Sequence, residues 1–238
     1  MTPMPAAQTP FQVSNGRFEL KFVAPPESTD WIISQLNMHP VLFKKAYPER
    51  RVNNVYFDTE NLEAYADNLS GISRRIKVRY RWYGIDNVAQ NGALEIKSRR
   101  NQLGWKMQHP IPGIKLLHGD GWRNAITALK KELPGEGKIW LDQFTRAVLI
   151  NRYRRQYFIS PDGNFRVTVD DDIRTYNQWL SGKINLRCRA EPMPDGVIVE
   201  VKFDQSQREK VSGILDTLSL RRSRHSKYMT GAEACFSL

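Results

Sequence analysis

The chain alternates apolar and polar side chains along much of its length, most clearly at residues 75–83. This segment reads Arg-Ile-Lys-Val-Arg-Tyr-Arg-Trp-Tyr. Successive side chains of a β-strand point to opposite faces, so Arg75, Lys77, Arg79 and Arg81 share one face and the apolar residues share the other. Same-face neighbours lie only about 7 Å apart, so these cations repel one another. An anion with several charges would relieve that repulsion.

The same alternation recurs in further segments, at residues 17–22, 94–99, 105–107, 165–170 and 199–203. In each segment one face is apolar and the other carries Arg or Lys, in most cases with a carboxylate. These are the groups that bind phosphate and divalent metal ions. We therefore expect the polar faces to form one shared anion site. The alternative is an antiparallel sheet whose basic outer face is in contact with solvent.

Other patterns predict the remaining elements. Helices are expected from Ser28-Thr29-Asp30 onward, over about 60–69, 122–133 and 205–220, and from Ser226 to near the end of the chain. Strands are expected over 52–58 and 148–160, the second forming a hairpin with 165–170 through the turn at 161–164. Residues 135–138 read Gly-Glu-Gly-Lys but lack the Ser or Thr that follows in a phosphate-binding loop, so a turn is predicted there.

Composition is consistent with one domain that binds an anion. The 238 residues, 40% of them hydrophobic, include six Trp and suffice for a single core. The net charge of +11 favours a nucleotide, polyphosphate, nucleic acid or acidic membrane surface as partner. Residues 1–16, rich in Pro, Ala, Thr and Gln, are predicted to be a flexible tail, and 17–238 a single domain.

Several classes of protein are disfavoured. Cys188 and Cys235 form neither a CxxC pair nor a disulfide framework, which is typical of a reducing compartment. No secretion signal is recognised, and no apolar run approaches the roughly 20 residues of a membrane span, so a cytoplasmic protein is expected. The four histidines lack metal-ligand spacing and there is no GxSxG motif, which argues against zinc and serine hydrolases.

Seven segments in order carry a resemblance to a known family. They are Arg-Phe-Glu-Leu-Lys-Phe at 17–22, Val-Tyr-Phe-Asp-Thr at 55–59, Arg-Tyr-Arg-Trp-Tyr-Gly at 79–84, Leu-Glu-Ile-Lys at 94–97, Tyr-Arg-Arg-Gln-Tyr-Phe at 153–158, Val-Glu-Val-Lys at 199–202 and Ser-Lys-Tyr at 226–228. Together they resemble the VTC domain, the polyphosphate polymerase catalytic domain of the triphosphate tunnel metalloenzyme (CYTH-like) superfamily. The resemblance implies an α+β fold, with a closed tunnel of about eight antiparallel strands, a basic lumen and helices packed on the outside. If the sheet closes, the charged strand faces would line the lumen of the tunnel.

The resemblance also places the working residues. It implies catalytic roles for Arg79, Arg81, Lys97, Arg155, Arg166 and Lys227. It implies substrate binding by Lys21, Lys106, Tyr153 and Ser226, and the alternation adds Arg75, Lys77 and Lys202. Glu200 is implied to hold Mn²⁺ or Mg²⁺. Glu19 is added as a second metal ligand because the alternation places it on the polar face of its strand, together with Lys21.

The implied activity is that of a metal-dependent phosphotransferase. The expected partners are ATP and inorganic polyphosphate: the γ-phosphoryl group of ATP passes to the end of the growing chain. Phosphoryl transfer proceeds through a loose transition state, so it depends on positioning and on cations more than on a protein nucleophile. Arg17 stands where the wider superfamily often has a glutamate, which favours the polymerase branch over the small triphosphatases.

Two other functions remain open at the sequence level. One is a triphosphatase or tripolyphosphatase on the same fold, and the other is a non-enzymatic protein that binds polyphosphate or RNA. RNA binding would need exposed aromatic platforms, whereas Tyr80 and Trp82 have the parity of core residues. DNA is not an expected partner, and the sequence leaves open whether there is a membrane partner.

Overall fold

The computed structural model describes residues 12–13, 17–85, 88–100, 103–180, 182–187, 196–218, 220–223 and 225–236. The strands are β1 (Gln12–Val13), β2 (Arg17–Ala24), β3 (Lys44–Asp58), β4 (Arg74–Tyr83), β5 (Val88–Arg100), β6 (Leu103–Lys115), β7 (Arg146–Ile159), β8 (Phe165–Asn177) and β9 (Val197–Asp204). The helices are η1 (Pro26–Ser28), α1 (Thr29–Asn37), α2 (Glu63–Leu69), α3 (Trp122–Glu132), α4 (Gly135–Gln143), η2 (Gln205–Gln207), α5 (Arg208–Leu218) and α6 (Lys227–Phe236).

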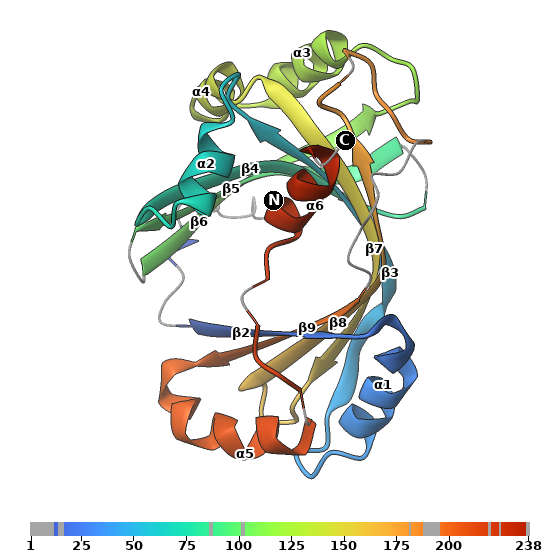
Figure 1. Cartoon of the computed structure of the whole chain (residues 1–238), viewed down its shortest axis with the longest axis vertical. Coiled ribbons are helices and arrows are strands. Elements are labelled where there is room, and N and C mark those ends of the chain that lie inside the picture. The colour runs from blue at the N-terminus through green and yellow to red at the C-terminus, as the bar shows by residue number, and fades with distance from the viewer. Residues whose placement is uncertain are drawn as a thin grey trace, which may run out of the picture.

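All nine strands belong to one antiparallel sheet, in the order β1-β6-β5-β4-β3-β7-β8-β9-β2. The sheet curves into an arch (Figure 1): β4, β5 and β6 form one arm, β2, β8 and β9 form the other, and β3 and β7 run through both. Helices α1 and α5 lie outside the arm that contains β2, and α3 and α4 lie outside the opposite arm. The predicted α+β class is therefore confirmed, and these four helices lie outside as predicted. Helix α6 differs, because its first turn packs against Tyr56 and reaches Asp170 between the two arms.

The predicted closure of the sheet into a tunnel is not confirmed. The sheet ends at β1 and β2, and within the described residues no ladder joins these two strands or joins β2 to β6. The free edge of β2 is occupied differently: Ser223 N donates to Lys21 O at 2.8 Å, and Phe22 forms an isolated bridge with Arg222. These backbone groups are thus engaged by the segment between α5 and α6.

The apolar strand faces pack beneath the outer helices, as the alternation predicts. In the β2 arm, the buried residues include Phe22, Ile32, Leu36, Val167, Val199, Val201, Phe203 and Ile214. In the β4 arm they include Val78, Tyr80, Trp82, Leu94, Ile96, Met107, Leu129 and Leu141. Tyr80 and Trp82 are fully buried, which confirms their assignment to the core. Each such side chain contributes roughly 1.5–3 kcal/mol by leaving water, which fixes the opposite faces of the strands toward the inside of the arch.

Most predicted elements form near the expected residues, and two differences have clear causes. Residues 135–138 are not a turn but the start of α4: Pro134 has extended geometry suited to a helix cap and Glu136 lies in the first turn, where the helix dipole favours an acid. Helix α2 starts at Glu63, because Asp58 accepts the backbone N–H groups of Ala64 and Tyr65 at 2.9 Å.

The predicted N-terminal tail is described only at Gln12 and Val13, and residues 1–11 and 14–16 lie outside the described residues. Gln12 and Val13 pair with Lys106 and Trp105 as edge strand β1. Cys235 is a buried free thiol, whereas Cys188 also lies outside the described residues. Among the described helices, none has both the length and the apolar character needed to cross a membrane.

Candidate functional site

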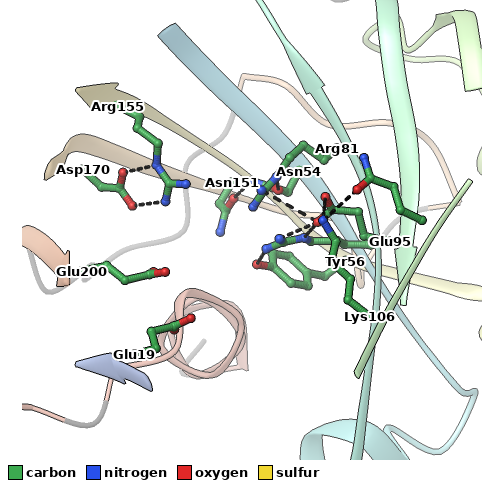
Figure 2. Close-up of polar contacts among 12 residues, drawn as sticks. Glu19, Asn54, Tyr56, Arg81, Glu95, Lys106, Asn151, Arg155, Asp170 and Glu200 are labelled. Atoms are coloured by element: carbon green, nitrogen blue, oxygen red, sulfur yellow. Dashed lines mark hydrogen bonds and ion pairs between the residues drawn. The ribbon is translucent and has the colours of Figure 1, made fainter. Parts of the chain in front are cut away.

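The polar strand positions meet on the concave face of the arch because the ladder registers align them. Across β3 and β4, Asn54 lies opposite Arg81, and Tyr56 lies opposite Arg79. Across β4 and β5, Arg79 in turn lies opposite Glu95. Figure 2 shows that Asn54, Tyr56, Arg81 and Glu95 project from neighbouring strands into one polar network.

Glu95 organises the cations of the β4 arm. Its Oε2 accepts from Arg79 Nε at 2.8 Å and Nη2 at 2.6 Å, and its Oε1 accepts from Lys106 Nζ at 2.6 Å. Arg81 Nη1 lies 3.8 Å from Oε2. Burial opposes ionisation of this carboxyl, but the charges of Arg79, Arg81 and Lys106 hold its pKa well below the usual range. One carboxylate therefore faces three cations, which leaves an excess of positive charge.

Asp170 organises a second cluster between β7, β8 and α6. Arg155 donates through Nε at 2.5 Å and Nη2 at 2.7 Å, and Lys227 Nζ donates at 2.6 Å. The ring of Tyr153 lies beside both cations, with its centroid 5.2 Å from Arg155 Cζ and 4.7 Å from Lys227 Nζ. Asp170 is fully buried, and the two cations outweigh that burial and lower its pKa.

A third cluster lies on β2 and β9, where Lys21 is opposite Glu200 and Glu19 is opposite Lys202. Lys202 Nζ lies 2.5 Å from Glu200 Oε1, and Lys21 Nζ lies 2.9 Å from Glu19 Oε1. Burial opposes ionisation of Glu200, but Lys202, Lys21 and Arg155 hold its pKa well below the usual range. The pKa of Lys21 is raised, because its two carboxylate neighbours outweigh burial.

These carboxylates fit a metal ion that is shared with a phosphate ligand. Within the described residues, no group of three or more His, Cys, Asp or Glu side chains forms a metal cage. Glu95 and Asp170 are each paired with arginine as well as lysine, whereas Glu19 and Glu200, which lie on the adjacent strands β2 and β9, are paired with lysines alone. Mg²⁺ is commonly bound by one or two carboxylates and completed by substrate phosphates and water, which is the donor set available here.

Lys77 and Lys97 differ from the other cations of the concave face. They lie directly opposite each other on β4 and β5, with Lys106 opposite Lys97 on β6. Within the described residues neither forms an ion pair with a carboxylate, and Lys77 Nζ donates to Ser226 Oγ at 2.8 Å. Surrounding protein, which displaces water, and the nearby cations lower the pKa of each to about 7. Lys97 nevertheless keeps an exposed surface on the concave side.

Helix α6 anchors the C-terminal residues of the site. Ser226 Oγ accepts the bond from Lys77 and also receives Met229 N at 3.4 Å, as expected of a helix cap. Tyr228 stacks on Tyr56 with ring centroids 5.2 Å apart and donates to Asp58 at 2.5 Å. The first turn of α6 is thereby held against β3, so Lys227 reaches Asp170 on β8.

The structure places most of the expected site residues within the three carboxylate clusters or in the lysine row, which is the set Lys77, Lys97 and Lys106 across β4, β5 and β6. Two lie at the margin. Arg75 begins the concave row of β4 and lies opposite Arg99. Arg166 is exposed and lies opposite Lys202 on β9, and the structure gives it no ion pair with a described residue.

Sequence reasoning missed two buried amides at the centre of the arch. Asn54 Nδ2 donates to Asn151 Oδ1 at 2.8 Å, and Arg81 Nε donates to Asn54 Oδ1 at 2.8 Å. Both asparagines are fully buried and hold Arg81 in position. The available signal was Asn53-Asn54 within an otherwise apolar strand segment, because a buried amide needs a partner. Asp170 was visible in the alternation but was assigned no role.

The VTC domain family model matches residues 16–236. The chain belongs to the VTC domain family. The resemblance drawn from the seven sequence segments is thus confirmed. Membership supports a polyphosphate-related enzyme. No curated protein matches the chain.

Solved structures share this fold at low identity. A candidate adenylate cyclase from Vibrio parahaemolyticus is 12% identical, with a TM-score of 0.53, covering 91% of this chain and 97% of its own. A protein from Pyrococcus horikoshii is 14% identical, with a TM-score of 0.50 and coverages of 90% and 96%. A candidate adenylyl cyclase from Hippeastrum, described as having a dominant triphosphatase activity, is 15% identical, with a TM-score of 0.49 and coverages of 90% and 93%. At these identities the first two similarities concern the fold alone.

Proposed function

We propose that this VTC domain protein is an ATP-dependent polyphosphate polymerase. The observation that carries the proposal is the pair Lys77 and Lys97, two lysines that face each other without a carboxylate partner among the described residues. Like charges directly opposite on neighbouring strands destabilise a sheet. An array of phosphate oxygens on the concave face would offset this repulsion, and a chain of phosphates would do so along several strands at once.

The arginines are preorganised for this ligand. Arg79 and Arg155 are each fixed by two hydrogen bonds to a buried carboxylate, and Arg81 is fixed by Asn54. Cations held in place before the reaction stabilise developing charge without reorganisation. In the proposed reaction, the bond between the γ-phosphorus and the bridging oxygen of ADP breaks. A terminal oxygen of polyphosphate forms the new bond, and ADP leaves.

Glu200 and Glu19 are the residues that would hold Mn²⁺ or Mg²⁺. When bound, the ion supplies neutralisation of phosphate charge as the reaction proceeds. Lys202 pairs with Glu200 and Lys21 pairs with Glu19, and these ion pairs orient both carboxylates on the concave face. In the sequence, Arg17 stands where the wider superfamily often has a glutamate, which supports the polymerase branch.

A triphosphatase is the second candidate. Lys97 keeps an exposed surface, so solvent water reaches the lysine row and could act as acceptor in place of polyphosphate. The two functions share the cations and the metal and differ in the acceptor alone. A non-enzymatic polyanion-binding protein is the third candidate, and it would need neither the metal nor ATP.

One parallel assay separates the three. Purified protein is incubated with ATP and Mn²⁺, and long-chain polyphosphate, ADP and free phosphate are measured together. The polymerase predicts polyphosphate and ADP. Free phosphate without polymer would replace the proposal with the triphosphatase. Tight polyphosphate binding without either product would leave the binding protein.

A further inference from the structure

Three tyrosines surround one arginine where β3 continues past the end of β4. The Arg50 guanidinium carbon lies 5.3 Å from the ring centroid of Tyr47, 5.7 Å from that of Tyr83 and 5.8 Å from that of Tyr157. Tyr47 and Tyr157 also contact each other edge to face, with centroids 5.6 Å apart. We refer to Tyr47, Arg50, Tyr83 and Tyr157 as the tyrosine cluster.

The strand path explains why these four side chains meet. Strand β4 ends at Tyr83, which lies opposite Val52, while β3 extends back to Lys44 and pairs there with β7. The β3–β7 ladder is irregular on both sides of Tyr47. Irregularities of this kind re-aim side chains and are common beside functional sites. Here they bring a β3 tyrosine and arginine together with tyrosines from β4 and β7.

The cluster is accessible. Tyr47 is 56% exposed and Tyr83 is 41% exposed, and Arg50 is exposed as well. Exposed aromatic faces beside a cation bind ligands that have a π-face of their own. A polyphosphate chain has no such face and no apolar surface, so the rings would add little to its binding. A nucleoside base has both.

The cluster adjoins the phosphate-binding arginines. Arg50 lies directly opposite Arg155 on β7, and Arg155 also lies 6.0 Å from the ring centroid of Tyr157. On β4, Tyr83 follows Arg81 by two positions and therefore lies on the same face. A base at the cluster thus has its triphosphate beside Arg155 and Arg81.

We propose that the tyrosine cluster binds the base of the nucleoside triphosphate substrate. The base stacks on the exposed rings of Tyr47 and Tyr83, and the phosphates extend toward Arg155 and Arg81. This proposal rests on the proposed function, because it assumes that the phosphoryl donor is a nucleotide. With this role, the tyrosines favour binding of ATP over binding of inorganic polyphosphate at one end of the concave face.

Calorimetric titration with two ligands tests the cluster without relying on turnover. ATP and inorganic tripolyphosphate, each with Mg²⁺, are titrated into the wild-type protein and into Tyr47→Ala and Tyr83→Ala. Loss of base stacking should weaken ATP binding about tenfold in each variant, whereas tripolyphosphate binding should change less than about twofold. Tyr83→Phe keeps the ring and should retain ATP affinity. Trp31→Ala, which removes a 44% exposed ring from the outer helix α1, is the matched control.

The outcomes distinguish this proposal from the proposed function. If the alanine variants weaken both ligands equally or neither ligand, the base site is overturned, and polyphosphate synthesis by the same preparations would leave the polymerase standing. If the wild-type protein binds neither ATP nor tripolyphosphate, both proposals fail. Selective weakening of ATP supports the base site.

Discussion

Lys77 and Lys97 lie directly opposite each other on β4 and β5, and neither has a carboxylate partner within the described residues. The surrounding protein lowers the pKa of both to about 7, from an ordinary value of 10.5. The neighbouring carboxylate Glu95 is taken by Arg79 and Lys106. A bound anion on the concave face would therefore stabilise the charged form of this lysine pair.

Proton uptake on ligand binding follows from this pair. A bound phosphate chain favours the charged lysines and raises their pKa values, so at pH 8 the protein should take up protons as tripolyphosphate binds. As the pH falls through 7 the lysines become charged before the ligand binds, so the uptake should shrink and should vanish only well below pH 7. Above pH 7 the affinity should fall as the pH rises. Calorimetry at pH 8 in two buffers of different ionisation enthalpy measures the uptake. Identical heats in both buffers would contradict the assignment, and Lys97→Met should reduce the uptake.

Arg81→Ala should reduce turnover strongly. Arg81 is held by Asn54 at 2.8 Å, and its Nη2 lies 3.4 Å from Tyr153 Oη, so its guanidinium is a fixed donor. By analogy with the loss of one oxyanion donor, we expect kcat to fall about 10²- to 10³-fold. Steady-state kinetics with ATP and Mn²⁺ provide the measurement. Arg100→Ala, at an exposed β5 position of opposite parity to the site, should leave kcat nearly unchanged. Full activity in Arg81→Ala would remove this arginine from the catalytic set.

Glu95→Gln should destabilise the ligand-free protein. The Glu95 side chain is 3% exposed and that of Arg79 is 11% exposed, so the substitution leaves a buried guanidinium without its counter-charge. Breaking one partner of a buried pair costs about 3 kcal/mol or more. Denaturant unfolding measures the change, and saturating tripolyphosphate should recover part of it. Glu60→Gln, which removes an exposed partner of Arg146, should cost at most about 1 kcal/mol. Equal stabilities of the two variants would show that Glu95 is not needed to hold the cations.

Glu200→Gln should separate metal dependence from phosphate binding. The substitution removes one of the two carboxylates proposed for the metal and also removes negative charge from a face that binds an anion. We expect Mn²⁺-dependent turnover to fall at least about 100-fold. Binding of tripolyphosphate in EDTA should stay equal or become tighter. Turnover that retained its wild-type Mn²⁺ dependence would exclude Glu200 as the metal ligand.

Gly92→Ala tests the packing behind the site. A Cβ atom at Gly92 would lie 2.0 Å from the hydroxyl oxygen of Tyr80, which is fully buried and donates to Ile111 O at 3.1 Å. Either the ring or the strand must move, at a cost of about 1–3 kcal/mol in the free energy of unfolding. Gly104→Ala is the control, since its Cβ would come no closer than 3.7 Å to a neighbouring atom. In thermal unfolding, Gly104→Ala should have a clearly higher midpoint temperature than Gly92→Ala.

Local alternation allowed much of this architecture to be read from the sequence. The two-residue period of a strand is a property of its covalent geometry, so Arg79 and Arg81 had to share a face, and Tyr80 and Trp82 had to share the other. The excess of cations over carboxylates along these faces indicated an anionic ligand. The helix beginning near Ser226 and the hairpin at residues 161–164 were also predictable, because caps and turns depend on a few adjacent residues.

Partnerships between distant strands were decided by the tertiary structure. Asp170 meets Lys227 across 57 positions and Asn54 meets Asn151 across 97, and both pairs depend on strand register and on the curvature of the sheet. Closure of the sheet would require another strand to pair with the outer edge of β2. At that edge the backbone N–H of Ser223 donates to Lys21 O instead. Side-chain parity is local and so can be read from the chain, whereas register, curvature and edge pairing result from competition among contacts over the whole domain.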